Sequence, residues 1–142
     1  MPVTRVATTD WEGSLLEGAG KVTFDSSGLG TYDVSWPARS AEPGGKTSPE
    51  ELIAAAHSSC FSMAFSAGLS KAGTPPTSLK TSAAVEFTPG TGITGIELTV
   101  VGVVPGISED DFVAAAQAAK EGCPVSKALT DTTITLKASL AS

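Results

Sequence analysis

Two cysteines, Cys60 and Cys123, are the residues of this chain whose side chains could do chemistry most readily. Cys60 lies among small and apolar residues, where a free cysteine is most simply a small buried hydrophobe. Cys123 directly precedes a proline, in a pattern typical of a helix N-cap, where backbone N–H groups and the helix dipole favour a thiolate. Two thiols 63 residues apart could form a peroxidatic and resolving pair. The alternative is that neither cysteine has a chemical role.

The single histidine, His57, stands one helical turn before Cys60. It is more simply a core histidine than a base, because a base at this position would be poorly placed for orientation by a third group. Zinc sites take three or four Cys and His ligands, more than this histidine and two cysteines supply at normal spacings. The glycines form no phosphate-binding loop. The sequence therefore predicts neither a metal nor another cofactor.

The two arginines, Arg5 and Arg39, are candidates for holding a thiolate. A carboxylate could orient such an arginine, and Glu50 is a candidate for that role. The alternatives are that Arg39 is a solvated loop charge and that Glu50 only interacts favourably with a helix dipole. Glu50 and Cys60 should lie about 15 Å apart along one straight helix. They would share a small site only if Arg39 reaches far or if two chains pair their helices.

A long helix is expected to carry both Glu50 and Cys60. Ser48-Pro49-Glu50-Glu51 forms a capping box with proline at the first helical position. The helix should end at Lys71 or Ala72, because Gly73 and two prolines follow. Apolar side chains surround much of it, so we expect it to be buried, with a second chain helping to cover it. These apolar residues are Leu52, Ile53, Ala56, Cys60, Met63, Ala64 and Ala67.

Shorter elements precede and follow the long helix. Strands are predicted at residues 4–9, 21–24 and 31–36, followed by a loop at 39–46. After the long helix we expect a hairpin of residues 82–87 and 95–103, a helix capped by Ser108 that ends at Gly122, a short helical turn beginning at Cys123, and a strand at 131–139. Because strands and helices do not alternate regularly, the order predicts an α+β fold.

Length and charge restrict the class of protein further. A chain of 142 residues that is 41% hydrophobic fits a single domain spanning residues 1–142. Its net charge of −6, with scattered Lys and Arg, makes nucleic acid an unexpected partner. No stretch reaches the ~18 consecutive apolar residues of a membrane span, and the N-terminus lacks the features of a signal peptide. We therefore expect a cytoplasmic protein with no membrane association and reduced cysteines.

Two separated cysteine motifs resemble those of one protein family. Residues 46–64 resemble the central helix of the osmotically inducible protein C (OsmC) and organic hydroperoxide resistance (Ohr) family, and residues 122–129 resemble its second cysteine motif. Residues 10–13, 104–107 and 133–137 are similar to the OsmC branch. The resemblance covers essentially the whole chain.

The resemblance implies a thiol-dependent peroxidase that reduces organic hydroperoxides to alcohols. It also implies an α+β fold of antiparallel sheets and long central helices in an intertwined homodimer. Cys60 would be the peroxidatic cysteine and Cys123 the resolving cysteine, joined afterwards in a disulfide that a dithiol, such as a dihydrolipoyl group, reduces. Arg39 would hold the Cys60 thiolate, with Arg5 as the alternative, and Glu50 would orient the arginine.

Two further interpretations stay open. Leu52, Phe61, Met63 and Phe65 are candidates to line a hydroperoxide pocket, although each could equally belong to the core. The alternative to an enzyme is a stress-induced dimer that binds a small apolar ligand and whose cysteines are merely buried.

Overall fold

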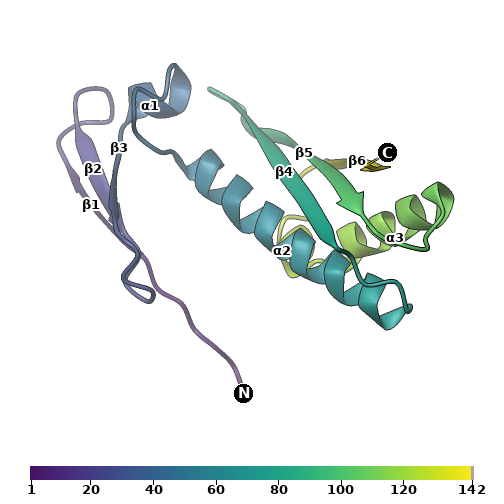
Figure 1. The fold of residues 1–142 in the computed structure, drawn as a ribbon. Helices are drawn as coiled ribbons and strands as arrows, with labels where there is room; N and C mark the ends of the chain where they lie inside the picture. Colours follow the sequence, from purple (N-terminus) through teal and green to yellow (C-terminus); the bar gives the residue numbers. More distant parts are fainter. Residues whose placement is uncertain (142) are drawn as a thin grey trace. The chain divides into compact units, whose positions relative to one another are not determined.

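In the computed structural model, which describes residues 1–141, the chain forms two compact units. The first comprises Met1–Leu52, and the second begins at Ile53. Both combine strands and helices, so the expected α+β class is confirmed (Figure 1). The expectation of one domain spanning residues 1–142 stays a prediction.

The first unit contains a three-stranded antiparallel sheet. Strands β1 (Thr8–Glu12), β2 (Ala19–Thr23) and β3 (Thr31–Val34) pair in the order β1-β2-β3. The strands were predicted near these places, but the first begins four residues later than expected. A short helix α1 (Trp36–Ser40) follows where a strand end and a loop were expected. Ser35 caps it by accepting a hydrogen bond from the Ala38 N–H at 3.2 Å.

Helix α2 (Pro49–Lys71) follows the prediction closely. Its first turn belongs to the first unit, and its residues from Ile53 onward belong to the second. The Ser48 hydroxyl accepts the N–H of Glu51 at 3.1 Å, as an N-cap residue does. At the other end, Gly73 has a φ of +90°, and the Thr74 N–H bonds to the Leu69 carbonyl at 2.9 Å. This is a Schellman ending, which explains why the helix stops at the glycine.

The second unit contains a mixed sheet. Strands β4 (Ser78–Thr88) and β5 (Gly92–Val103) form the expected hairpin, and β6 (Ile134–Leu140) pairs with β5 in parallel. Helices α3 (Glu109–Gly122) and α4 (Pro124–Ala128) connect β5 to β6. Such a crossover lets β6 run in the same direction as β5. The expectation of antiparallel pairing is therefore wrong for this pair of strands.

The core of the second unit lies between α2, α3 and the sheet. Phe61, Phe65 and Leu69 recur at every fourth position of α2 and are fully buried. The Phe65 ring lies 5.6 Å from Phe61 and 5.1 Å from Phe112 on α3. Helix α2 also lies along β4, where the Ser62 hydroxyl donates to Thr81 Oγ1 at 2.8 Å (Figure 1). This packing holds the middle of α2 firmly in place.

The opposite face of α2 is exposed within one chain. Ala56, Met63 and Ala67 lie on it, and Met63 is 73% exposed. Full burial of the helix is therefore not reached in a single chain, and the second chain expected to cover it stays a prediction. Among the described residues, α2 is also the one helix long and apolar enough to cross a membrane.

Candidate active site

The two cysteines lie against each other in the second unit. Cys60 is near the middle of α2, and Cys123 is the N-cap residue of α4. Their Sγ atoms are 3.1 Å apart, and both are free thiols. Because a disulfide bond is about 2.05 Å long, a movement of roughly one ångström would join them. The structure thus brings together two residues that stand 63 positions apart in the sequence.

The two thiols have different environments. Burial raises the pKa of Cys60 above its ordinary value, and the contact with Cys123 adds to this rise. Burial also acts to raise the pKa of Cys123, but the polar hydrogens near its sulfur, those of Ser126 and Val125 and the Cys60 thiol, lower it overall. The beginning of α4 therefore favours a thiolate at Cys123, as its Cys-Pro pattern suggests.

His57 lies one turn before Cys60 on α2 and is completely buried. Its Nε2 atom is 2.7 Å from the hydroxyl oxygen of Ser126 on α4. Burial lowers the pKa of His57, which favours the neutral ring. The interpretation of His57 as a core residue therefore agrees with its burial. Ser126 was not singled out in the sequence, although it lies at the third position of the helix that Cys123 begins.

Arg39 and Glu50 form an ion pair within the first unit. The guanidinium Nε lies 3.0 Å from Glu50 Oε1, and Nη2 lies 2.9 Å from Oε2. Such bidentate pairing fixes the plane of the guanidinium. Glu50 is buried, and Arg39 lies in the last turn of α1. Arg5, the alternative arginine, donates instead to the neighbouring Thr4 carbonyl at 3.1 Å.

An apolar cavity of about 400 Å³ lies beside Arg39 in the first unit. Leu52 is among its lining residues, and its role in a hydroperoxide pocket stays a prediction. Phe61 and Phe65 are fully buried in the core, and Met63 is exposed, so these three do not line this cavity. The remaining lining residues are Thr9, Trp11, Leu15, Val22, Val34, Ser35, Trp36 and Pro49.

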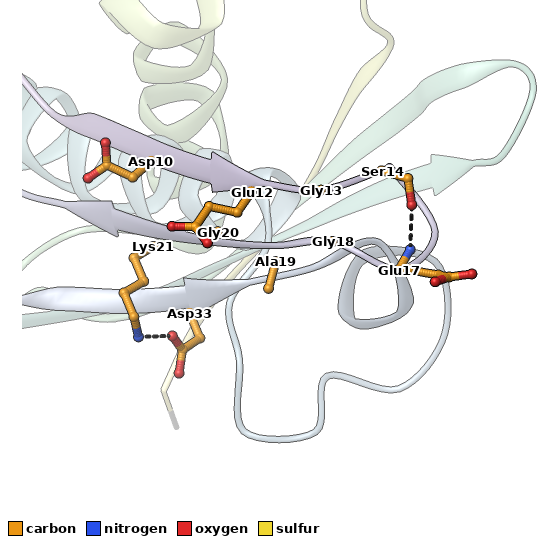
Figure 2. Close-up of a pocket in the computed structure, with 10 residues that line it drawn as sticks. All are labelled: Asp10, Glu12, Gly13, Ser14, Glu17, Gly18, Ala19, Gly20, Lys21 and Asp33. Atoms are coloured by element: carbon orange, nitrogen blue, oxygen red, sulfur yellow. Dashed lines mark hydrogen bonds and ion pairs between the residues drawn. The ribbon is translucent and has the colours of Figure 1, made fainter.

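A second hollow, of about 710 Å³, lies on the sheet of the first unit and is lined by charged and small residues. Figure 2 shows Asp10 and Glu12 on β1, with Lys21 on β2 and Asp33 on β3. The Lys21 ammonium lies 2.7 Å from Asp33 Oδ1, so it is already paired. Neither cysteine lies among the lining residues, and this hollow is not a candidate for thiol chemistry. Within residues 1–141, no cluster of three His, Cys, Asp or Glu could hold a metal ion.

The four predicted site residues thus form two pairs, each within its own unit. Cys60 contacts Cys123, and Arg39 contacts Glu50. The union of the two pairs in one active site stays a prediction.

Comparison with known proteins places the chain in a family. The sequence model of the OsmC-like proteins matches residues 42–138, which include Glu50 and both cysteines. The chain is 41% identical to Peroxiredoxin OsmC of Escherichia coli K12 over 132 residues, covering 91% of this chain and 92% of that protein. The chain belongs to the OsmC family. Peroxiredoxin OsmC of Shigella flexneri matches this OsmC chain over the same shares and at the same 41% identity.

Solved structures agree with the OsmC fold. The organic hydroperoxide resistance protein OsmC of Legionella pneumophila matches 99% of this chain and 98% of its own, with a TM-score of 0.66 and 24% identity. An OsmC-like protein of Mycoplasma pneumoniae matches all of both chains with a TM-score of 0.74 and 13% identity. OhrB of Bacillus subtilis matches 96% of this chain and 98% of its own, with a TM-score of 0.65 and 24% identity. The expected OsmC-like fold is thereby confirmed.

Proposed function

We propose that this protein is a thiol-dependent peroxidase that reduces organic hydroperoxides to alcohols. The observation that carries the proposal is the 3.1 Å separation of the Cys60 and Cys123 sulfurs. Membership of the OsmC family and the names of the relatives, which are peroxiredoxins and hydroperoxide resistance proteins, support the same chemistry. The cytoplasm, where thiols are kept reduced, is the proposed location.

Cys60 is the proposed peroxidatic residue, because it is only partly buried while Cys123 is completely buried. Its thiolate attacks the distal oxygen of the hydroperoxide, the O–O bond breaks, and the alkoxide leaves as an alcohol after gaining a proton. Cys60 is then a sulfenic acid. Cys123 attacks its sulfur, water leaves, and a disulfide forms. A dithiol reductant, with dihydrolipoyl groups as one candidate, returns both thiols.

Arg39 and Glu50 are the proposed partners of the peroxidatic thiolate. The guanidinium of Arg39 would stabilise the thiolate and the charge that develops on the leaving oxygen. Its bidentate pairing with Glu50 would keep the guanidinium oriented. The apolar cavity beside Arg39 suits the organic part of a hydroperoxide. We propose that a homodimer brings this pair to the thiols.

The exposed face of α2 supports the proposed homodimer. Met63 is largely exposed there, although it lies on a long helix without charged residues between Glu51 and Lys71. Exposed apolar side chains of this kind commonly mark an interaction surface. A second copy of α2 would present the same apolar face, as a twofold interface requires.

The intact mass of the denatured protein tests the proposal after one equivalent of cumene hydroperoxide is added to the reduced form. A loss of about two mass units is expected, because two thiol protons are removed as the disulfide forms. Cys60→Ser should abolish this reaction and all turnover. Cys123→Ser should gain about sixteen mass units as a sulfenic acid and stop after one turnover. Repeated turnover by Cys60→Ser would contradict the proposal.

The second candidate function is a dimer that binds a small apolar ligand without catalysis. The apolar cavity of the first unit favours it. The same experiment separates the two functions, since a binding protein would keep both thiols and its original mass after the hydroperoxide is added.

A further inference from the structure

The apolar cavity beside Arg39 is built entirely from the first unit. Strands β1, β2 and β3, helix α1, the first turn of α2 and the turn between β1 and β2 all contribute lining residues. Its volume of about 400 Å³ lies in the range of small-molecule sites. Since a water-sized group occupies roughly 30 Å³, about a dozen non-hydrogen atoms would fill it. The cavity therefore has the size of one compact organic group.

Both tryptophans of the chain, Trp11 and Trp36, line this cavity. The Trp11 Nε1–H donates to the Gly13 carbonyl at 3.0 Å, so the polar edge of the indole is satisfied and the ring is held. The ring lies over Gly20 on β2, where a Cβ atom would come within 2.7 Å of Trp11 Cε3. Because the glycine leaves room for the ring, Trp11 forms a fixed apolar wall of the cavity.

Leu15 reaches the same cavity from the turn between β1 and β2. This turn is held by Ser14, whose carbonyl accepts the Gly18 N–H at 2.8 Å and whose hydroxyl accepts the Glu17 N–H at 3.1 Å (Figure 2). Leu15 is 56% exposed, as expected for a side chain at the rim of the cavity. Leu16 is 68% exposed in the same turn but is not a lining residue. The two leucines therefore form a matched pair for experiments.

Arg39 is the charged residue of the lining, and its ion pair with Glu50 compensates its charge. The Ser35 hydroxyl, also in the lining, accepts the Ala38 N–H. A charged ligand would gain little in such a cavity, whereas a neutral molecule with an apolar body could bury that body against the indoles. An oxygen at one end of the molecule could accept a hydrogen bond from the guanidinium. A hydroperoxide is a neutral molecule of this kind.

We propose that Trp11, Leu15 and Trp36 are specificity-determining residues, which select hydroperoxides whose organic group is compact, aromatic or branched, and large enough to fill the cavity. The inference rests on the proposed function, in which Arg39 serves the peroxidatic thiolate. The phenyl ring of cumene hydroperoxide can pack against an indole, whereas the smaller tert-butyl group leaves part of the cavity unfilled.

Intrinsic fluorescence tests the binding site without any peroxide, because both tryptophans of the chain line the cavity. We expect 2-phenyl-2-propanol, the alcohol formed from cumene hydroperoxide, to change the emission of the reduced protein in a saturable way. The smaller tert-butanol should bind at least about tenfold more weakly, since it buries less apolar surface. The absence of a saturable change with 2-phenyl-2-propanol, or equal binding of the two alcohols, would overturn the inference.

The two leucines of the turn provide the matched comparison. Leu15→Ala should weaken the binding of 2-phenyl-2-propanol about fivefold, because apolar contact at the rim is lost. Leu16→Ala should bind this alcohol like the parent. An equal effect of the two substitutions would show that Leu15 has no special relation to the ligand and would count against the inference.

Single-tryptophan variants locate the ligand further. Trp11→Phe and Trp36→Phe each keep an apolar ring at the substituted position and leave one indole to report. Both variants should retain a fluorescence change with 2-phenyl-2-propanol. A change that disappears in one variant, while that variant binds the alcohol by calorimetry, would contradict a role for the tryptophan that remains.

The rate of Cys60 oxidation tests the selection of substrates. Leu15→Ala should lower the rate with cumene hydroperoxide about fivefold more than the rate with hydrogen peroxide, which has no organic group, and Trp36→Leu about tenfold more. Leu16→Ala should keep the parent ratio of the two rates. A parent ratio in both Leu15→Ala and Trp36→Leu would contradict the inference alone. If no hydroperoxide oxidises Cys60 in the parent, the proposed function fails, while the fluorescence titrations still decide whether the cavity binds an organic group.

Discussion

At the scale of single residues, the chemistry depends on which groups surround each sulfur and which hold the arginine. Arg39 is bonded to a buried carboxylate through two of its nitrogens, while Arg5 bonds to its own neighbour in the chain. His57 is completely buried, and this burial favours the neutral ring. Both features lead to measurable expectations.

The substitution Arg39→Lys tests the proposed role of the guanidinium. Lysine keeps the charge but cannot form the bidentate contact with Glu50, so its ammonium would be poorly oriented toward a peroxide. We expect the oxidation of Cys60 by cumene hydroperoxide to slow about tenfold or more, in a stopped-flow measurement, with little change in folding. Arg5→Lys is the matched control. A slower reaction in Arg5→Lys and a normal one in Arg39→Lys would assign the role to Arg5.

The burial of His57 makes stability depend on pH. Burial lowers its pKa in the folded state, so below the ordinary value of about 6.5 the unfolded chain binds a proton that the folded chain does not. The stability that the neutral ring contributes is present above pH 6.5 and is lost as the pH falls toward the folded-state pKa. The loss should not exceed about 1.4 kcal/mol per pH unit. Urea unfolding at pH 7.5 and 5.5 should show a larger decrease for the parent than for His57→Gln. Equal decreases would contradict this expectation.

At the scale of elements, local signals placed the helices well and the strands less well. Three helix ends depend only on residues nearby in the sequence: the N-caps Ser48 and Ser108 and the end of α2 at Gly73. The structure confirms all three. Strand β4 begins at Ser78 rather than at the expected residue 82, because its first residues are in a strand only through pairing with the end of β5. Helix α1 is only five residues long and was missed despite its serine cap.

Gly102 on β5 shows how closely α3 packs on the sheet. A Cβ atom at this position would lie 2.6 Å from Cε1 of the Phe112 ring, a distance at which something must move. Gly102→Ala should therefore lower the free energy of unfolding by about 1–3 kcal/mol, measured by urea denaturation. Gly95→Ala, on the same strand, is the control, because the nearest atom to its Cβ would be the Thr133 carbonyl oxygen at 3.8 Å. Equal effects of the two substitutions would show that overpacking is not the cause.

At the scale of the whole molecule, the proposed homodimer depends on the exposed face of α2. Met63→Glu places a charge in the middle of that face and should convert a dimer into monomers, as measured by sedimentation velocity. Leu29→Glu is the control, because Leu29 is 76% exposed on the first unit and Met63 is 73% exposed. A monomeric parent protein would contradict the homodimer directly. A dimer that survives Met63→Glu would contradict the use of this face.

The sequence alone determined the features that depend on neighbouring residues. These are the ends of α2, the cap of α3, the position of Cys123 at the beginning of a short helix and the α+β class. Only the tertiary structure decided the contacts between residues far apart in the chain. Four features depend on such contacts: the contact of Cys60 with Cys123, the pairing of Arg39 with Glu50, the parallel direction of β6 and the contact of His57 with Ser126. The physical reason is that caps and turns are satisfied by hydrogen bonds within one or two helical turns, whereas the contacts between helices and strands depend on how whole elements pack.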